Sequence, residues 1–250
     1  IKSITEKIDI FLTLRRFSCY SHILNIYEKL GRIEQEIDLF IEQYVFAANR
    51  LASNIVVKET LVLKLDSIRV KTAENQALKG RIYKDCWQLN YTEGKDAQQY
   101  LDNAINAYRT GSHLDIRDGF PAINLATLLR IRGEENDIFE MRKVLNHLEY
   151  NLMVSTDAFD NIKGQLFESS PKRRQADYWD TATVLEMAIL NNHFDQAMTL
   201  IDILIARHTE GWMLETTVNN LALIMAHTDT YFQQCLAPVF YTLKGKAGLM

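Results

Sequence analysis

Hydrophobic and polar positions recur along this chain at helical spacing. No stretch alternates apolar and polar residues between turn residues for long, as a half-buried strand would. Even the apolar runs 55–57 and 61–63 are interleaved with Lys58, Glu59 and Lys64 at helical spacing, which favours helix over strand. The pattern therefore predicts an all-α chain.

Periodicity and helix-breaking residues together predict about 10 to 12 helices. Gly31 and Gly133 follow two of the expected helix ends, where a left-handed glycine is common. Pro121 suits a first helical turn, and Pro238 is expected to kink or shorten the last helix. The expected helices cover residues 3–16, 19–30, 32–52, 56–70, 72–90, 96–110, 120–132, 136–153, 178–191, 194–207, 212–226 and 230–241.

Two segments between these helices are predicted loops. The first covers 111–118, and the second is the polar stretch 154–176, with room for one short helix at 158–167. The second loop contains the basic run 172–174, which we interpret as solvated.

The expected helices form pairs that recur at a regular interval along the chain. Helices of ~12 to 18 residues joined by short turns, recurring every ~35 to 45 residues, fit a helix–turn–helix solenoid. The predicted fold is an all-α, tetratricopeptide-like α-solenoid of stacked antiparallel helix pairs. We divide it into an N-terminal helical region, 1–70, and a tetratricopeptide-like domain, 71–250, continuous with it. Such a fold presents a surface on which partners usually bind.

Charge and composition exclude several classes of function. The net charge of −4 and the pI near 5.9 argue against a nucleic-acid-binding surface driven by bulk charge. The three cysteines are far apart and in no metal-ligand spacing, which indicates reduced thiols in a cytoplasmic protein. No apolar run reaches the ~18 to 20 residues that a membrane span needs. The scattered histidines form no metal motif, so we expect no metal and no cofactor.

The segment 80–85 is the most informative motif. Arg81, Lys84 and Asp85 lie on a polar helical stripe beside the apolar stripe that contains Ile82 and Cys86. Two interpretations are open. One is an i,i+4 ion pair between Arg81 and Asp85, worth a few tenths of a kcal/mol. The other is a polar pocket between helices, bordered by Tyr83, that holds an anionic or aromatic ligand.

Two further places carry polar residues on helices. Asp177 and Asp180 flank Tyr178 and Trp179 at an expected helix start. Asp177 can cap the helix and Asp180 can favour its dipole, or the carboxylate and the aromatic rings can line the same pocket as Arg81. Asn124 lies on a mostly apolar helix, so its amide needs partners, either a backbone group of a neighbouring helix or a ligand.

Five sequence blocks, taken in order, resemble a known family. They are Gly80–Asp85, Ala104–Arg109, Ala122–Leu129, Tyr178–Asp180 and Trp212–Thr217. Together they resemble the TRAFs-binding domain of apoptosis signal-regulating kinases, a tetratricopeptide-like regulatory region with bacterial relatives. The resemblance covers residues 78–226. Ala122 stands where the family has a glycine, and Glu210-Gly211 where it has a proline pair.

The resemblance implies scaffolding, regulation or ligand sensing without kinase activity, since no glycine-rich phosphate loop, His-Arg-Asp or Asp-Phe-Gly motif occurs. We expect a non-catalytic domain that binds a protein partner. Other domains of a longer parent chain count among the candidate partners. The alternative is a nucleotide-type sensor with a polar pocket. Both hypotheses use the same candidate binding residues, which are Arg81, Tyr83, Lys84, Asp85, Asn124, Tyr178, Trp179 and Asp180.

Overall fold

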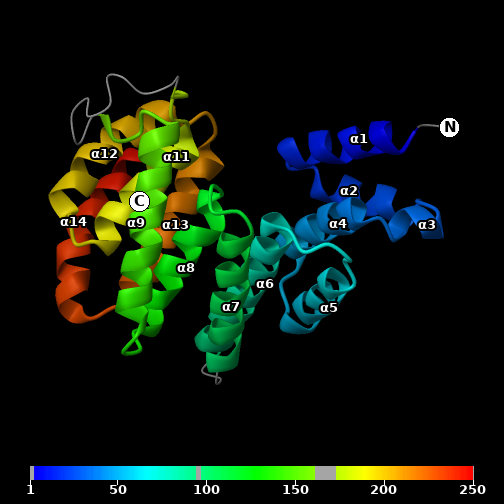
Figure 1. The fold of residues 1–250 in the computed structure, drawn as a ribbon, viewed down its shortest axis with the longest axis horizontal. Coiled ribbons are helices and arrows are strands. Elements are labelled where there is room, and N and C mark those ends of the chain that lie inside the picture. The colour runs from blue at the N-terminus through cyan, green and yellow to red at the C-terminus, as the bar shows by residue number, and fades with distance from the viewer. Residues whose placement is uncertain (1–2, 94–96, 161–172, 250) are drawn as a thin grey trace. The chain divides into compact units, whose positions relative to one another are not determined.

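The predicted all-α fold is confirmed in a computed structural model, which describes residues 3–93, 97–160 and 173–249. Within these ranges the only β-type pairing is one isolated parallel bridge between Thr156 and Arg174. The thirteen described helices (Figure 1) are α1 (Ile4–Arg16), α2 (Tyr20–Glu28), α3 (Arg32–Gln35), α4 (Asp38–Leu51), α5 (Ile55–Asp66), α6 (Ala73–Thr92), α7 (Gln98–Leu114), α8 (Gly119–Arg132), α9 (Asp137–Ser155), α11 (Tyr178–Leu190), α12 (Phe194–Arg207), α13 (Gly211–Ala226) and α14 (Thr230–Lys246).

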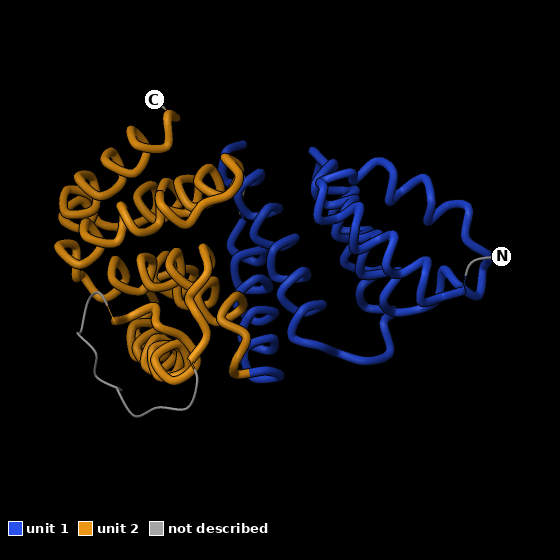
Figure 2. Tube along the Cα trace, turned by 90° about the horizontal axis from the view of Figure 1, so that it is seen from above, with its two compact units in different colours: residues 1–115 blue, residues 116–250 orange. Residues whose placement is uncertain are grey.

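The helices pack mainly against their neighbours in the chain, as expected for stacked helix pairs. They form two compact units, residues 1–115 and residues 116–250, drawn in blue and orange in Figure 2. The first unit contains α1 to α7, and the second contains α8, α9 and α11 to α14. The division into 1–70 and 71–250 stays a prediction.

In the first unit, α4 is the central helix and contacts α1, α2, α3, α5 and α6. One apolar core lies between α1, α2 and α4 and contains Phe11, Ile23 and Phe40. A second core lies between α4, α5 and α6 and contains Val45, Leu61 and other buried side chains. The α6/α7 pair is the most extensive contact of this unit. These contacts fix the polar stripe of α6 against α4 and α5.

In the second unit, the helix pairs are α8/α9, α11/α12 and α13/α14. Helix α11 also packs against α8, and α12 against α14. Most of α8 and α11 is buried, which explains why their sequences are apolar on nearly every face. Helix α11 therefore gives a rigid base to the side chains at its start.

Several helix boundaries differ from the sequence prediction; the helix expected over 56–70, for example, ends at Asp66. The expected helix 32–52 is split into α3 and α4. The Tyr27 hydroxyl donates to the Gln35 carbonyl (2.7 Å), and the Gln35 amide donates to the Tyr27 carbonyl (3.0 Å). The first bond occupies the Gln35 carbonyl, which a continuous helix would bond to its own backbone, and the second, from the Gln35 side chain, fixes this residue against α2. Helix α7 continues to Leu114, so the loop predicted from residue 111 begins later.

The glycines and the proline expected to end helices behave as predicted in one case and differently in two. Gly133 ends α8 in the left-handed conformation, with φ of 68°, as predicted. Gly31 does not, since its φ is −64° and it caps the start of α3. Pro238 lies inside α14, which runs on to Lys246. The buried Val239 and Leu243 pack this second half of α14 into the unit, and that packing outweighs the one backbone hydrogen bond that proline removes.

The segment after α9 is only partly described. Residues 158 and 159 form a turn, and the remainder of the short helix predicted at 158–167 lies mostly outside the described residues. The chain is described again from Arg173. The bridge between Thr156 and Arg174 therefore brings together the two described ends of the predicted loop.

Candidate partner-binding site

The eight candidate residues fall in both units, and each unit is described by itself. Helix α6 of the first unit carries Arg81, Tyr83, Lys84 and Asp85. In the second unit, α8 carries Asn124, and the first turn of α11 carries Tyr178, Trp179 and Asp180. The two halves of the candidate set are therefore two local groups, each with its own chemistry.

Asp85 belongs to a three-helix polar cluster and does not pair with Arg81. Its Oδ2 accepts hydrogen bonds from Lys58 Nζ on α5 and Asn49 Nδ2 on α4, both at 3.0 Å. Lys58 Nζ also donates to Asn49 Oδ1 at 2.7 Å. Because the Lys58 side chain is only 5% exposed, its ammonium needs a carboxylate to offset lost hydration. The interpretation of an Arg81–Asp85 ion pair is wrong.

The other α6 candidates border this cluster, and Arg81, Tyr83 and Lys84 are all half-buried. Tyr83 packs against the core between α4, α5 and α6, and burial raises the pKa of its phenol. The Lys79 ammonium lies 5.9 Å from the Tyr83 ring centroid. Tyr83 therefore acts first as a packing residue of the first unit.

Cys86 is buried on the apolar side of α6, as the sequence indicated. Burial raises the pKa of its thiol from 9.0 to about 11. Only the thiolate reacts with alkylating reagents, so the native thiol reacts about a hundredfold more slowly at pH 8 than a thiol of pKa 9.0. We expect Cys19 and Cys235, which are half-buried, to be alkylated by iodoacetamide long before Cys86. Mass spectrometry of the native and urea-unfolded chain measures this, and equal labelling of all three thiols in the native chain would contradict it.

At the start of α11, two aspartates cap each other's backbone. Asp177 Oδ1 accepts from the Asp180 N–H (3.0 Å), and Asp180 Oδ2 accepts from the Asp177 N–H (2.8 Å). This is the capping arrangement that the sequence suggested for Asp177. Asp180 is also held by the Arg174 guanidinium in a two-pronged ion pair, at 2.5 and 2.8 Å. The bond to Asp180 raises the pKa of Arg174.

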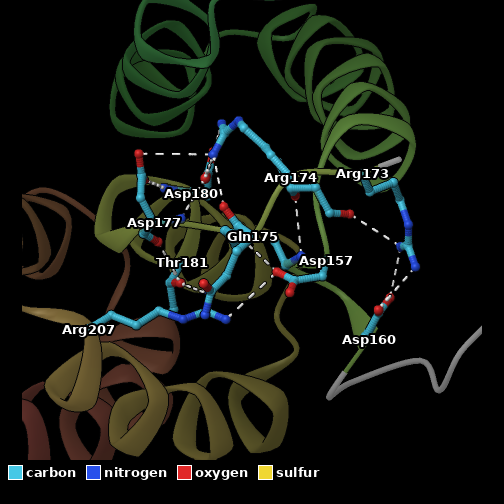
Figure 3. Close-up of polar contacts among 12 residues, drawn as sticks. Asp157, Asp160, Arg173, Arg174, Gln175, Asp177, Asp180, Thr181 and Arg207 are labelled. Atoms are coloured by element: carbon cyan, nitrogen blue, oxygen red, sulfur yellow. Dashed lines mark hydrogen bonds and ion pairs between the residues drawn. The ribbon is translucent and has the colours of Figure 1, made fainter. Parts of the chain in front are cut away.

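Arg173 and Arg174 anchor the segment before α11 (Figure 3). Arg173 makes its own two-pronged ion pair with Asp160, at 2.9 and 3.0 Å, and donates to the Thr156 carbonyl. The interpretation of the basic run as a solvated loop holds for Arg174, which is exposed although it is paired, whereas Arg173 is half-buried, and Lys172 lies outside the described residues. Paired charges of this kind hold backbone in place.

Arg207 extends the network to α12. Its Nη1 donates to Thr181 Oγ1 at 2.6 Å, and its Nη2 lies 3.8 Å from Asp157 Oδ1. The same Asp157 oxygen accepts the Ala176 N–H at 2.7 Å. Figure 3 shows these side chains grouped around the start of α11. Sequence reasoning missed Arg207 and Asp157, because their partners lie 19 to 50 residues away and no local spacing reports them.

Tyr178 and Trp179 point to different environments. The Tyr178 hydroxyl is bonded to the Met213 carbonyl (2.9 Å) and to Thr217 Oγ1 (2.7 Å) on α13, and burial raises its pKa to about 12. Trp179 is 41% exposed, and its ring centroid lies 5.7 Å from that of Trp212, which is 40% exposed. The result is a solvent-facing indole pair, Trp179 and Trp212, on a buried tyrosine. Trp212 was not among the candidate site residues, although it opens the last family block.

Asn124 is buried, as predicted, and its Nδ2 donates to the Phe120 carbonyl one turn earlier in α8 (2.9 Å). This bond lies within its own helix.

Among the described residues, no group of three or more His, Cys, Asp or Glu side chains is placed to hold a metal ion. No described helix is long and apolar enough to cross a membrane.

Comparison with known proteins gives a family. The model of the MAP3K TRAFs-binding domain family matches residues 5–235. A curated relative, the mitogen-activated protein kinase kinase kinase nsy-1 of Caenorhabditis elegans, is 27% identical over 239 residues. The alignment covers 85% of this chain but 14% of the relative. The match confirms the resemblance and extends it beyond residues 78–226, and the chain belongs to the MAP3K TRAFs-binding domain family.

Proposed function

We propose that this chain is a non-catalytic regulatory domain that binds a protein partner, with the indole pair Trp179 and Trp212 at the centre of the binding surface. The family's description, TRAFs-binding domain, supports a protein partner and makes a TRAF protein the first one to test. The similarity to a MAP3 kinase supports a place in a cytoplasmic signalling protein. The nucleotide-sensor alternative gains no support, because the family that matches is described by protein binding.

The observation that carries the proposal is the exposure of two indoles on a rigid base. Clustered aromatic side chains in solvent contact mark interaction surfaces, and tryptophan is enriched among the residues that dominate protein–protein binding energy. Below the indole pair, Tyr178 is bonded to α13, and Asp180 is fixed by Arg174 and the helix cap. A preorganised aromatic surface loses little entropy on binding.

We expect the double change Trp179→Ala and Trp212→Ala to weaken binding of a purified TRAF protein by about thirtyfold or more, as truncation of a binding hot spot does. Biolayer interferometry with the whole chain immobilised measures the dissociation constant. Both side chains are more than a third exposed, so we expect the melting temperature to change little.

The matched control is Tyr231→Ala, which removes a 76% exposed aromatic side chain from α14 of the same unit. It should change the dissociation constant by less than about twofold, as for a side chain outside the interface. Equal losses in the control and the double variant would reject the indole pair as the centre. Undetectable binding of any TRAF protein by the unaltered chain would reject that partner.

A further inference from the structure

One side of the first unit gathers three arginines from three helices. The Arg15 guanidinium on α1 lies 3.9 Å from the Phe46 ring centroid, and the Arg50 guanidinium on α4 lies 5.4 Å from the same centroid. Arg15 is neutralised by Glu74, at 2.6 Å. The Arg50 guanidinium therefore lies near the Arg15–Glu74 ion pair, in which the charge of Arg15 is already neutralised.

The polar cluster described above joins the two helices that carry Arg50 and Arg81. Asn49, which precedes Arg50, bonds Asp85, which is one turn after Arg81 on the same face of α6. The electrostatics agree with this placement. Partial burial lowers the pKa of the Arg50 guanidinium, the positive charge of Arg81 lowers it further, and the Asp85 carboxylate acts in the opposite direction. Two like charges from α4 and α6 are held close together.

Neither of these two guanidinium groups has a direct anionic partner within the described part of the chain. Arg50 and Arg81 form no hydrogen bond or ion pair with another described residue. The Asp85 oxygen within reach of the cluster already accepts from Lys58 and Asn49. Like charges at short range repel, and an oxyanion placed between them relieves that repulsion. The chain as a whole carries −4, so this positive surface is a local exception.

We infer that Arg50 and Arg81 form a binding site for the carboxylate side chains of an acidic segment in a partner protein. Arginine binds planar carboxylates through two parallel hydrogen bonds. The site is open, since Arg50 is exposed as a residue although its guanidinium is partly covered, and Arg81 is half-buried. An open site suits a chain segment lying across it better than an enclosed small ligand. Phe46, also half-buried, offers apolar contact to the same segment. The inference rests on the proposed function for the existence of a protein partner, and adds a second contact surface and its chemistry.

The test uses the whole chain and a fluorescein-labelled oligoglutamate peptide, followed by fluorescence anisotropy at about 0.05 M salt, where surface charges are weakly screened. We expect binding that the double variant Arg50→Gln/Arg81→Gln weakens at least tenfold. The double variant Arg50→Lys/Arg81→Lys should bind the peptide with an affinity between those of the unaltered chain and the glutamine variant, because lysine keeps the charge without the two-pronged geometry. An oligoglutamine peptide should not bind.

Two controls separate this site from other effects. Arg142→Gln removes an exposed arginine from α9 in the second unit and should leave oligoglutamate binding within about twofold. Trp179→Ala/Trp212→Ala should leave it unchanged, so failure of the indole surface and failure of this site are distinguishable. Oligoglutamate binding that is absent, unaffected by the double arginine variant, or equally weakened by Arg142→Gln would overturn the inference. Displacement by inorganic phosphate as effective as by unlabelled peptide would assign the site to a free anion, and would also overturn it.

Discussion

Replacing Gly80 by alanine should destabilise the first unit by about 2 kcal/mol, although alanine is the better helix former. A Cβ atom at this position would lie 2.9 Å from the Tyr108 ring on α7, closer than packed atoms approach. The Tyr108 side chain is fully buried, so it cannot move without displacing its neighbours. Overpacking a core costs about 1–3 kcal/mol, and a 2.9 Å approach to a ring that cannot move belongs at the upper end of that range. Subtracting the ~1 kcal/mol gained in helix propensity leaves a net loss of about 2 kcal/mol. Thermal unfolding followed by circular dichroism should show a melting temperature roughly 5–10 °C lower.

A matched glycine distinguishes steric conflict from a general effect of the substitution. Gly211 opens α13, and a Cβ atom there would meet nothing within 4 Å. Gly211→Ala should therefore be neutral or stabilising by a few tenths of a kcal/mol. In a Tyr108→Leu background the added methyl group has more room, so Gly80→Ala should cost much less there. If Gly80→Ala is as harmless as Gly211→Ala, the two helices do not cross as closely as described.

Gly80 shows which part of the fold the sequence could reveal. Its helix was predicted within two residues at each end from hydrophobic periodicity, and the structure adds a capping box of Thr72 and Asn75 at its start. The reason for a glycine in mid-helix was not visible. It depends on Tyr108, which is 28 positions away and reaches Gly80 only through the packing of α6 on α7.

The same limit applies to the polar residues of both candidate groups. The sequence singled out Asp85 and Asp180 as candidate binding residues, but the partners it suggested within the same element lay only one or two helical turns away. The partners that the structure assigns are Lys58, 27 positions before Asp85, and Arg174. A lysine on an otherwise apolar face, as Lys58 is on α5, was a signal available in the sequence. Arg174 gave none, because its position depends on the bridge to Thr156.

The exposed fraction of each side chain was the other property that residue spacing along the sequence could not predict. Tyr178 and Trp179 are adjacent and belong to the same family block, yet one is 3% exposed and the other 41%. The difference arises because α13 lies on the Tyr178 side of α11 and accepts its hydroxyl. A helical wheel gives relative directions on one helix, but the identity of the covering helix comes from tertiary packing.

The second large effect concerns the polar cluster of Asn49, Lys58 and Asp85. Replacing Asp85 by alanine should destabilise the first unit by about 3 kcal/mol, because it leaves the buried Lys58 ammonium without a carboxylate. Its remaining partners would be the side-chain and main-chain oxygens of Asn49, at 2.7 and 3.3 Å. Urea unfolding followed by circular dichroism measures the loss as a lower midpoint at unchanged slope.

An exposed pair of the same chemistry in the same unit is the control. Lys79 and Asp66 lie 2.5 Å apart with side chains 21% and 49% exposed, so Asp66→Ala should cost less than about 1 kcal/mol. The double change Lys58→Met/Asp85→Asn removes both charges and leaves an amide for Asn49 to bond, and it should recover most of the stability lost in Asp85→Ala. If Asp85→Ala costs no more than Asp66→Ala, the Lys58 ammonium is not held in a buried site, and the placement of Arg50 beside Arg81 loses its structural basis.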